Sequence, residues 1–282
     1  MTEGLKKENS LFQVRLWGVR GTMPVCSDQF REFGGNTTCI EVRLGDRVIM
    51  FDAGSSLPSA GAALAAEGVK DFNFFFSHCH YDHICGLPYF KPMYLPGYTV
   101  SFWSGHLAGK MTTREMIRDF MRPPWFPVAP DICKASITTR DFHAGDVLEP
   151  FPDISIRTGA LTHPGGAIGY RVEWGGRSFA MITDTEHVDG ELDPVVMDLI
   201  RDVDLFLYDT TYLESELPNY RGYGHSTWEQ AVKLAEAAGA KRVGFMHHAP
   251  TRSDAELSDI DQLAAKRFEG AFCAREGQTI KL

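Results

Sequence analysis

An apolar run, Phe72 to Phe76, leads directly into the segment Ser77-His78-Cys79-His80-Tyr81-Asp82-His83. The run predicts a buried strand, and the turn that leaves it can point the first two histidines one way and the carboxylate and last histidine another. Neutral imidazole and carboxylate groups suit zinc, iron or manganese. Four polar loop residues are the simpler alternative. The convergence of these groups on one strand end favours a metal site, and their spacing suits two ions better than one.

Composition limits the class of protein. The 282 residues are 44% hydrophobic and 23% charged, which is ordinary for a globular chain of one large or two small domains. The 28 Lys and Arg against 37 Asp and Glu give a net charge of −9, which argues against a long nucleic acid as main partner. No run approaches the roughly 18 apolar residues of a membrane span, and the first ten residues lack the apolar stretch of a signal peptide. We therefore expect a cytoplasmic protein without a membrane partner.

Short apolar runs alternate with helical segments, which indicates an α/β fold. An Ala-rich helix is expected over Leu57 to Gly68, and Ser-x-x-Glu capping boxes at Ser226 and Ser253 predict two later helices. Two strand-rich halves, each closed by helices, suggest two sheets packed face to face with helices outside. The predicted strands are Phe12 to Trp17, Thr38 to Leu44, Arg47 to Phe51, Phe72 to Ser77, Ile154 to Thr158, Ala167 to Trp174, Ser178 to Thr183, Leu205 to Tyr208 and Arg242 to Met246, and the later helices are Thr227 to Ala238 and Asp254 to Glu269.

The segment from about 91 to 140 interrupts this pattern, because its prolines cluster and only Thr112 to Arg122 looks helical. We interpret it as an insertion in a single domain spanning residues 1–282. It holds seven Lys and Arg against three Asp and Glu, whereas the chain as a whole is acidic. Arg114, Arg118 or Arg122 could therefore lie near an anionic substrate, and a solvated helix face is the alternative.

The motif from His78 to His83 resembles the His-x-His-x-Asp-His motif of the metallo-β-lactamase superfamily. The resemblance implies a four-layer αβ/βα sandwich whose active site lies at the edge between two sheets. It also implies a later His, a bridging Asp and a final His, for which His163, Asp184 and His247 are the candidates. Phe51-Asp52-Ala53-Gly54 resembles the family's upstream Asp and Gly.

By this resemblance one metal ion is held by three histidines, the other by a carboxylate and two histidines, and Asp184 bridges the two. His248 is the alternative to His247 as last ligand, and it would otherwise support the ligands from behind. Asp52 either orients a ligand through a hydrogen bond or only caps a turn. The implied ligands are His78, His80 and His163 for the first ion, and Asp82, His83 and His247 for the second.

A second resemblance concerns Tyr208-Asp209-Thr210-Thr211-Tyr212 and Gly224-His225-Ser226-Thr227. These segments resemble the acidic and His-Ser-Thr motifs of the transfer-RNA 3′-processing phosphodiesterase branch. The resemblance implies that Asp209 orients His225, which then faces the scissile phosphate. The family's usual acid is Glu, so Asp209 is one methylene shorter, and His225 could instead only precede a helix cap. The candidate catalytic residues are thus Asp82, Asp209 and His225.

Trp17-Gly18-Val19-Arg20-Gly21, Gly34-Gly35-Asn36-Thr37 and Pro123-Pro124-Trp125-Phe126 resemble segments of a bacterial branch of hydrolases, some of them cyclic-nucleotide phosphodiesterase-like. The glycines could merely make turns. The aromatic residues Trp103, Trp125 and Phe126 form either a local core or a wall on which a base stacks.

Together these features predict a dinuclear metal-dependent hydrolase. The hydrolase expected first is a phosphodiesterase that acts on a small anionic substrate, such as a cyclic nucleotide or dinucleotide. Two ions about 3.5 to 4 Å apart can bind a phosphodiester and lower the pKa of a bridging water to about 7. Zinc is the expected metal, with manganese or iron as alternatives. The alternative functions are a carboxyl-ester, lactone or thioester hydrolase on the same site, and a non-catalytic diiron sensor. The resemblance suggests a homodimer, and the sequence leaves the oligomeric state open.

Overall fold

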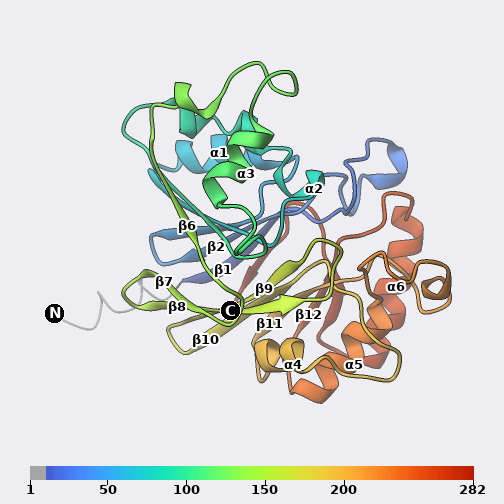
Figure 1. Ribbon diagram of the computed structural model, residues 1–282. Coiled ribbons are helices and arrows are strands. Elements are labelled where there is room, and N and C mark those ends of the chain that lie inside the picture. The colour runs from blue at the N-terminus through green and yellow to red at the C-terminus, as the bar shows by residue number, and fades with distance from the viewer. Residues whose placement is uncertain (1–10) are drawn as a thin grey trace.

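The computed structural model describes residues 11–282 as two seven-stranded sheets packed face to face, with helices on both outer faces (Figure 1). The predicted α/β sandwich is therefore confirmed. Among the described residues, no helix is long and apolar enough to cross a membrane.

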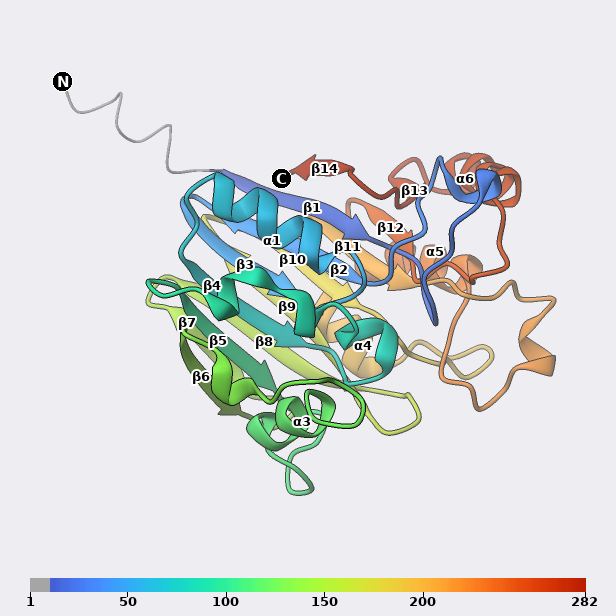
Figure 2. The same ribbon diagram turned by 90° about the horizontal axis from the view of Figure 1, so that it is seen from above.

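The first sheet has the strand order β14-β1-β2-β3-β4-β5-β6. Strands β14, β1, β2 and β3 pair antiparallel, and β3 to β6 pair parallel. Figure 2 shows β14, at the end of the chain, lying beside β1 at its beginning. The strands are β1 Phe12–Gly18, β2 Cys39–Leu44, β3 Arg47–Phe51, β4 Asp71–Phe76, β5 Thr99–Ser104, β6 Ser136–Asp141 and β14 Thr279–Lys281.

The second sheet has the order β13-β12-β11-β10-β9-β8-β7. Strands β7 to β10 pair antiparallel, whereas β10 to β13 pair parallel. The strands are β7 Val147–Phe151, β8 Ile154–Leu161, β9 Ala167–Trp174, β10 Arg177–Ile182, β11 Leu205–Asp209, β12 Val243–Met246 and β13 Ala271–Cys273.

Helices cover each sheet on its outer face (Figures 1 and 2). The first sheet carries α1 Leu57–Ala66, α2 Tyr81–Ile84 and α3 Thr113–Phe120, and the second carries α4 Pro194–Ile200, α5 Trp228–Ala238 and α6 Asp254–Arg267. Short 3-10 helices are η2 Asp28–Phe30, η3 Leu87–Tyr89, η4 Lys91–Tyr94, η5 Pro130–Ile132 and η6 Leu217–Asn219.

Three apolar layers hold the sandwich together. Phe51 of the first sheet packs against Tyr170 and Phe179 of the second, with ring centroids 5.1 and 6.2 Å apart. A second cluster lies between the first sheet and α1 and α3, and a third lies between the second sheet and α4, α5 and α6. Successive side chains of a strand point to opposite faces of its sheet, and both faces of each sheet are covered. Side chains on both faces of β4 are therefore buried, which explains its nearly continuous apolar run.

The expected insertion needs correction, because two strands of residues 91–140 belong to the first sheet. Strand β5 pairs with β4 on one side and with β6 on the other. Residues 91–98, which contain η4, and the segment between β5 and β6, which contains α3, lie outside the sheet. The prolines around these strands hid them, and edge strand β6 has few buried side chains.

One of the two capping boxes is also corrected. Ser253 and Glu256 form the predicted reciprocal box of α6. Helix α5 instead begins after Thr227, whose side chain accepts a hydrogen bond from the Gln230 backbone. The Ser226 hydroxyl contacts His187 Nδ1 at 2.7 Å and is therefore used in the core.

Candidate metal centre

The topology brings six strand ends to one edge of the sandwich. Strands β10, β11 and β12 are parallel, and β8 runs in the same direction because two antiparallel pairings separate it from β10. In the first sheet β3 and β4 are parallel. Asp52 follows β3, His78 follows β4, His163 follows β8, Asp184 follows β10, Asp209 ends β11 and His247 follows β12.

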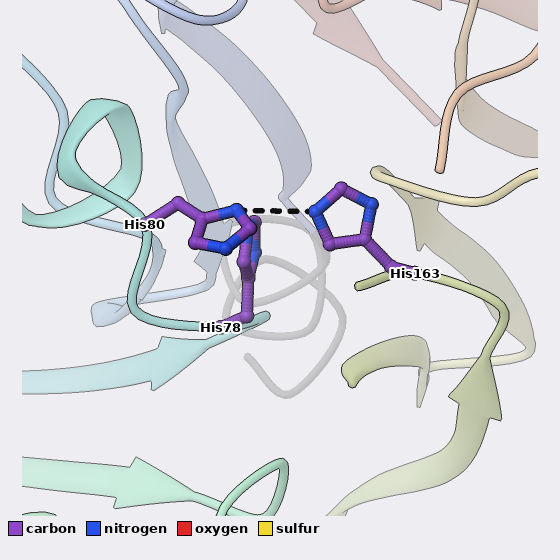
Figure 3. Close-up of side chains that lie close together, drawn as sticks. All are labelled: His78, His80 and His163. Atoms are coloured by element: carbon purple, nitrogen blue, oxygen red, sulfur yellow. Dashed lines mark hydrogen bonds between the residues drawn. The ribbon is translucent and has the colours of Figure 1, made fainter. Parts of the chain in front are cut away.

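The three residues predicted for the first ion lie together (Figure 3). His80 Nδ1 is 3.1 Å from His163 Nε2, and the ring centroid of His78 is 4.4 Å from that of His80. His163 Nδ1 lies 2.8 Å from the carbonyl oxygen of Gly224 and donates to it. This hydrogen bond fixes the tautomer and leaves Nε2 as the nitrogen that faces the cluster.

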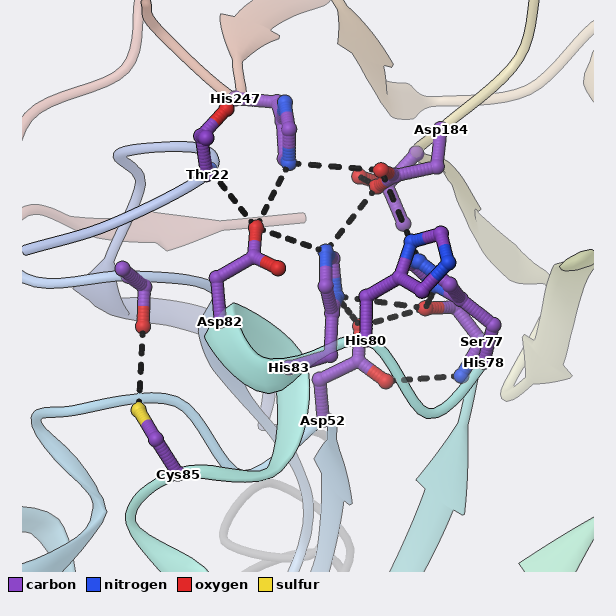
Figure 4. A network of polar contacts seen from close by, with 12 residues as sticks. Thr22, Asp52, Ser77, His78, His80, Asp82, His83, Cys85, Asp184 and His247 are labelled. Atoms are coloured by element: carbon purple, nitrogen blue, oxygen red, sulfur yellow. Dashed lines mark hydrogen bonds and ion pairs between the residues drawn. The ribbon is translucent and has the colours of Figure 1, made fainter. Parts of the chain in front are cut away.

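The three residues predicted for the second ion form a neighbouring group (Figure 4). Asp82 Oδ2 lies 3.2 Å from His83 Nε2 and 3.1 Å from His247 Nε2. The same oxygen accepts a hydrogen bond from the Thr22 backbone N–H at 2.7 Å. The Thr211 hydroxyl oxygen lies 2.9 Å from His247 Nδ1, so both ends of that ring are held.

Asp184 lies between the two groups. One of its oxygens is 3.2 Å from His83 Nε2, and the other is 3.4 Å from His247 Nε2 and 3.7 Å from His163 Nε2. Burial would raise the pKa of this carboxyl, but the charges of His247 and His83 outweigh burial and lower the pKa well below 3.8. Asp184 is therefore an ionised, buried group placed to serve both sides.

Asp52 supports the second group from beneath. Its Oδ2 accepts a hydrogen bond from His83 Nδ1 at 2.7 Å, and its two oxygens also accept from the backbone N–H and the hydroxyl of Ser77. Of the two roles considered for Asp52, the contact with His83 supports the orienting role.

His247 and His248 point in different directions. His247 faces Asp82 and Asp184, whereas His248 Nε2 donates to the Ala274 carbonyl oxygen at 2.9 Å. His248 is fully buried, and burial lowers its pKa to about 3. The expectation that His248 supports the ligands is therefore corrected: its ring anchors the segment before β14 instead.

Three of the strand-end residues adopt the left-handed backbone conformation. The φ angles are 58° for Asp52, 55° for Asp184 and 58° for His247. Non-glycine residues seldom adopt this conformation, which costs on the order of 1 to 3 kcal/mol and is concentrated at functional sites. The sharp turn that it makes directs each side chain across the end of its own strand.

The donor set fits divalent metal ions. The Nε2 atom of His78 is buried and has no hydrogen-bond partner within residues 11–282, and the Nε2 atom of His83 faces the carboxylates of Asp82 and Asp184 at 3.2 Å. Burial lowers the pKa of His78 well below 6.5, so its ring is neutral and has a free lone pair at neutral pH. A buried nitrogen without a partner is costly, and a metal ion would satisfy it. Imidazole nitrogens and carboxylate oxygens are the ligands that zinc, manganese and iron take.

Asp209 and His225 stand beside these residues. Asp209 Oδ2 accepts from His225 Nδ1 at 2.8 Å, and Asp209 is completely buried. The His225 ring stacks on that of His247, with centroids 4.9 Å apart and an angle of 21°. A 460 Å³ pocket is lined by Thr22, Cys79, His80, Tyr81, Asp82, Asp184, His225 and His247.

A family model for the beta-lactamase superfamily domain matches residues 47–248. The chain belongs to the beta-lactamase superfamily. The resemblance read from the motif is thus confirmed, together with the metallo-β-lactamase fold and its class of hydrolases.

A named relative and two solved structures are similar to this chain. Ribonuclease Z of Gemmatimonas aurantiaca is 25% identical over 292 residues, covering 83% of this chain and 86% of that protein. The structure of the metallo-beta-lactamase fold protein YhfI from Bacillus subtilis has a TM-score of 0.73 at 18% identity, and covers 97% of this chain and 100% of that chain. The structure of human tRNase Z, short form, has a TM-score of 0.66 at 16% identity, and covers 95% of this chain and 98% of that chain. These structural likenesses show the fold.

Glu186 is not among the site residues predicted from the sequence. The Glu186 carboxylate accepts hydrogen bonds from the backbone N–H groups of Gly222 and Gly224 at 2.8 to 3.0 Å. Glu186 therefore holds the loop that carries His225 and Gly224, whose carbonyl oxygen accepts the hydrogen bond from His163. Its only signal in the sequence is its position two residues after Asp184.

The basic residues of the segment before β6 do not line the 460 Å³ pocket. Arg114 and Arg118 line a separate pocket of 210 Å³, and Arg122 forms an ion pair with Asp119. All three arginines are exposed. Their arrangement agrees with the alternative of a solvated helix face.

Proposed function

We propose that this protein is a hydrolase with two divalent metal ions that cleaves a small phosphodiester, such as a cyclic nucleotide or dinucleotide. The main support is the Asp209–His225 pair, because His225 lines the same 460 Å³ pocket as the predicted ligands. An ester, lactone or thioester hydrolase on the same ligands would not need this pair. A phosphodiester with a poor leaving group needs a proton donor at the departing oxygen.

The predicted ligands divide between the two ions. Asp184 serves both, and Asp52, Gly224 and Thr211 orient His83, His163 and His247 through hydrogen bonds. Two ions bound there would supply Lewis acidity and ionise a water near neutral pH. The first ion is held by His78, His80 and His163, and the second by Asp82, His83 and His247.

His225 acts on the leaving group in this proposal. Asp209 holds its Nδ1, so Nε2 is the ring nitrogen left to act on substrate. From this position Nε2 can give a proton to the departing oxygen or donate to the phosphate oxygens, while the buried Asp209 carboxylate keeps the ring oriented. Asp209 is thus a positioning residue for His225.

A small diester fits better than a long RNA. The net charge of −9 opposes the approach of a polyanion, and no Lys or Arg of residues 11–282 lines the pocket around the predicted ligands. The named relatives include a ribonuclease, so RNA belongs among the substrates that are tested.

The test is a substrate panel assayed with zinc and with manganese. It contains bis(p-nitrophenyl) phosphate, cyclic mononucleotides, cyclic dinucleotides, a structured RNA, a lactone and a thioester. We expect hydrolysis of the small diesters above all others. Turnover of the lactone or thioester with no diester hydrolysis would contradict the proposal. Iron in the purified protein with a visible absorption band, and no hydrolysis, would instead support a diiron sensor.

A further inference from the structure

A second pocket, of 560 Å³, adjoins the pocket around the predicted metal ligands. Cys79 and Tyr81 line both pockets, so the two lie side by side. The volume is that of a typical small-molecule site. We call it the aromatic pocket, because its walls include Tyr81, Tyr89, Phe120, Trp125 and Phe126.

The aromatic pocket presents large apolar side chains to solvent. Trp125 is 79% exposed, Tyr81 78% and Tyr89 63%. Phe126 lies edge-on to Tyr89 with ring centroids 5.8 Å apart, which steadies the wall without covering it. Exposed aromatic residues gathered around one hollow are typical of a binding site.

Trp103 has a different role. It is only 9% exposed and stacks on Phe75, with ring centroids 5.2 Å apart and an angle of 15°. Of the aromatic residues considered from the sequence, Trp103 therefore belongs to the core, whereas Trp125 and Phe126 line the aromatic pocket.

Charge separates the two pockets. Asp119 is the only charged residue that lines the aromatic pocket within residues 11–282, and its carboxylate is paired with Arg122 at 3.3 Å. A phosphate would find no cation on these walls. A neutral ring with N–H donors would find aromatic faces and one carboxylate acceptor.

We propose that the aromatic pocket binds the nucleobase of a nucleotide diester while the phosphate lies at the predicted metal ligands. This inference rests on the proposed function, because it assigns the two ends of one substrate to adjoining pockets. Tyr81 lines both pockets and stands between the predicted ligands His80 and Asp82 in the chain, so the aromatic pocket begins directly beside these ligands. Trp125 is the largest exposed ring available for stacking.

The first test measures nucleoside binding without any reaction. Adenosine and guanosine are titrated into the full-length protein as purified, and saturation-transfer NMR gives the Kd of each. Base stacking on an aromatic side chain predicts that Trp125→Leu raises the Kd by about tenfold or more. Trp125→Phe keeps a ring and should largely restore binding. Leu263→Ala, at an apolar residue of α6 that is 53% exposed, is the matched control and should leave the Kd unchanged. Equal binding by Trp125→Leu and the wild type, or no saturable binding by the wild type, would overturn the proposal.

The second test compares two diesters with the same leaving group. The p-nitrophenyl ester of thymidine 5′-phosphate carries a base, and methyl p-nitrophenyl phosphate does not. Trp125→Leu should lower kcat/KM for the first by about tenfold and leave the second unchanged. An equal effect on both esters would overturn the proposal. If the wild type hydrolyses neither ester, the phosphodiesterase assignment fails, and the nucleoside titration still decides whether the aromatic pocket binds a base.

Discussion

Asp209 Oδ2 and His225 Nδ1 lie 2.8 Å apart beside the predicted metal ligands. Asp209 is buried at the end of β11, and the loop that precedes α5 carries His225 to it. The pair therefore joins the end of β11 to the loop before α5, and His225 lines the 460 Å³ pocket.

If His225 protonates the leaving oxygen, its loss should matter most when that oxygen departs poorly. His225→Ala should depress cleavage of a cyclic nucleotide by roughly 100-fold or more, while bis(p-nitrophenyl) phosphate loses much less. Steady-state kinetics on both substrates measure the difference, and His143→Ala, at an exposed histidine, is the control. Equal losses would assign His225 to charge stabilisation at the phosphate. No loss on either diester would refute its role.

Asp209→Asn should reproduce this pattern more weakly, because the amide keeps a hydrogen-bond acceptor for His225 Nδ1 but removes the carboxylate charge beside the ring. Steady-state kinetics on the same two substrates measure the pattern. An unchanged kcat on the cyclic nucleotide would contradict the positioning role of Asp209. Metal content should remain that of the wild type.

Asp184 contacts both groups of predicted ligands, so its replacement should affect both ions. Asp184→Asn is the suitable variant, because asparagine tolerates the left-handed conformation at φ 55°. We expect metal content, measured by elemental analysis, to fall for both ions and hydrolysis to be abolished. Asp198→Asn on α4, where the side chain is 56% exposed, should change neither. Two equivalents retained by Asp184→Asn would refute the bridging role.

Glu186 acts at a distance through the loop that it holds. Glu186→Gln replaces one of the two acceptor oxygens by an NH2 group, so at least one of the three hydrogen bonds from Gly222 and Gly224 is lost. The lost hydrogen bond should raise the activation free energy by about 1.4 kcal/mol, because His225 is held less firmly. This would reduce kcat on the cyclic nucleotide about tenfold with little change in KM. Glu191→Gln, at an exposed position, is the control. An unchanged kcat would show that the loop keeps its place without Glu186.

Arg20 is a structural residue of the N-terminal loop. It is fully buried, and its guanidinium donates to the carbonyl oxygens of Gly34, Ala249 and Arg252. Burial lowers its pKa to about 10, so it stays charged at neutral pH. Arg20→Leu leaves these carbonyl groups without hydrogen-bond donors. It should lower the free energy of unfolding, measured by urea denaturation, by about 3 kcal/mol or more. The matched control Arg31→Leu, at a side chain that is 80% exposed, should stay within about 0.5 kcal/mol of the wild type.

Most of the sandwich could be predicted because apolar alternation is a local signal. Strands β3 and β9 have the predicted bounds, and α1 begins at the predicted Leu57. Strand β6 was missed because an edge strand buries few of its side chains. Helix α5 was assigned to the wrong cap because Ser226 and Thr227 both offer a hydroxyl, and only the packing of Ser226 against His187 separates them.

The candidate site could be predicted as a set of residues and not as a geometry. His163, Asp184 and His247 each follow a predicted strand, so their order in the chain could be matched to a family motif. The left-handed turns at Asp184 and His247 leave no trace in the residue types. The contact from Glu186 to Gly224 spans 38 residues, and no local pattern encodes it.

In the proposed function, two metal ions act together on a phosphodiester. The most direct measurement is the rate of cyclic-nucleotide hydrolysis as zinc or manganese is added back to protein freed of metal by a chelator. Activity should rise with added metal and reach a plateau at two equivalents per chain. A plateau at one equivalent, activity that needs no metal, or no diester hydrolysis at any metal content would contradict it.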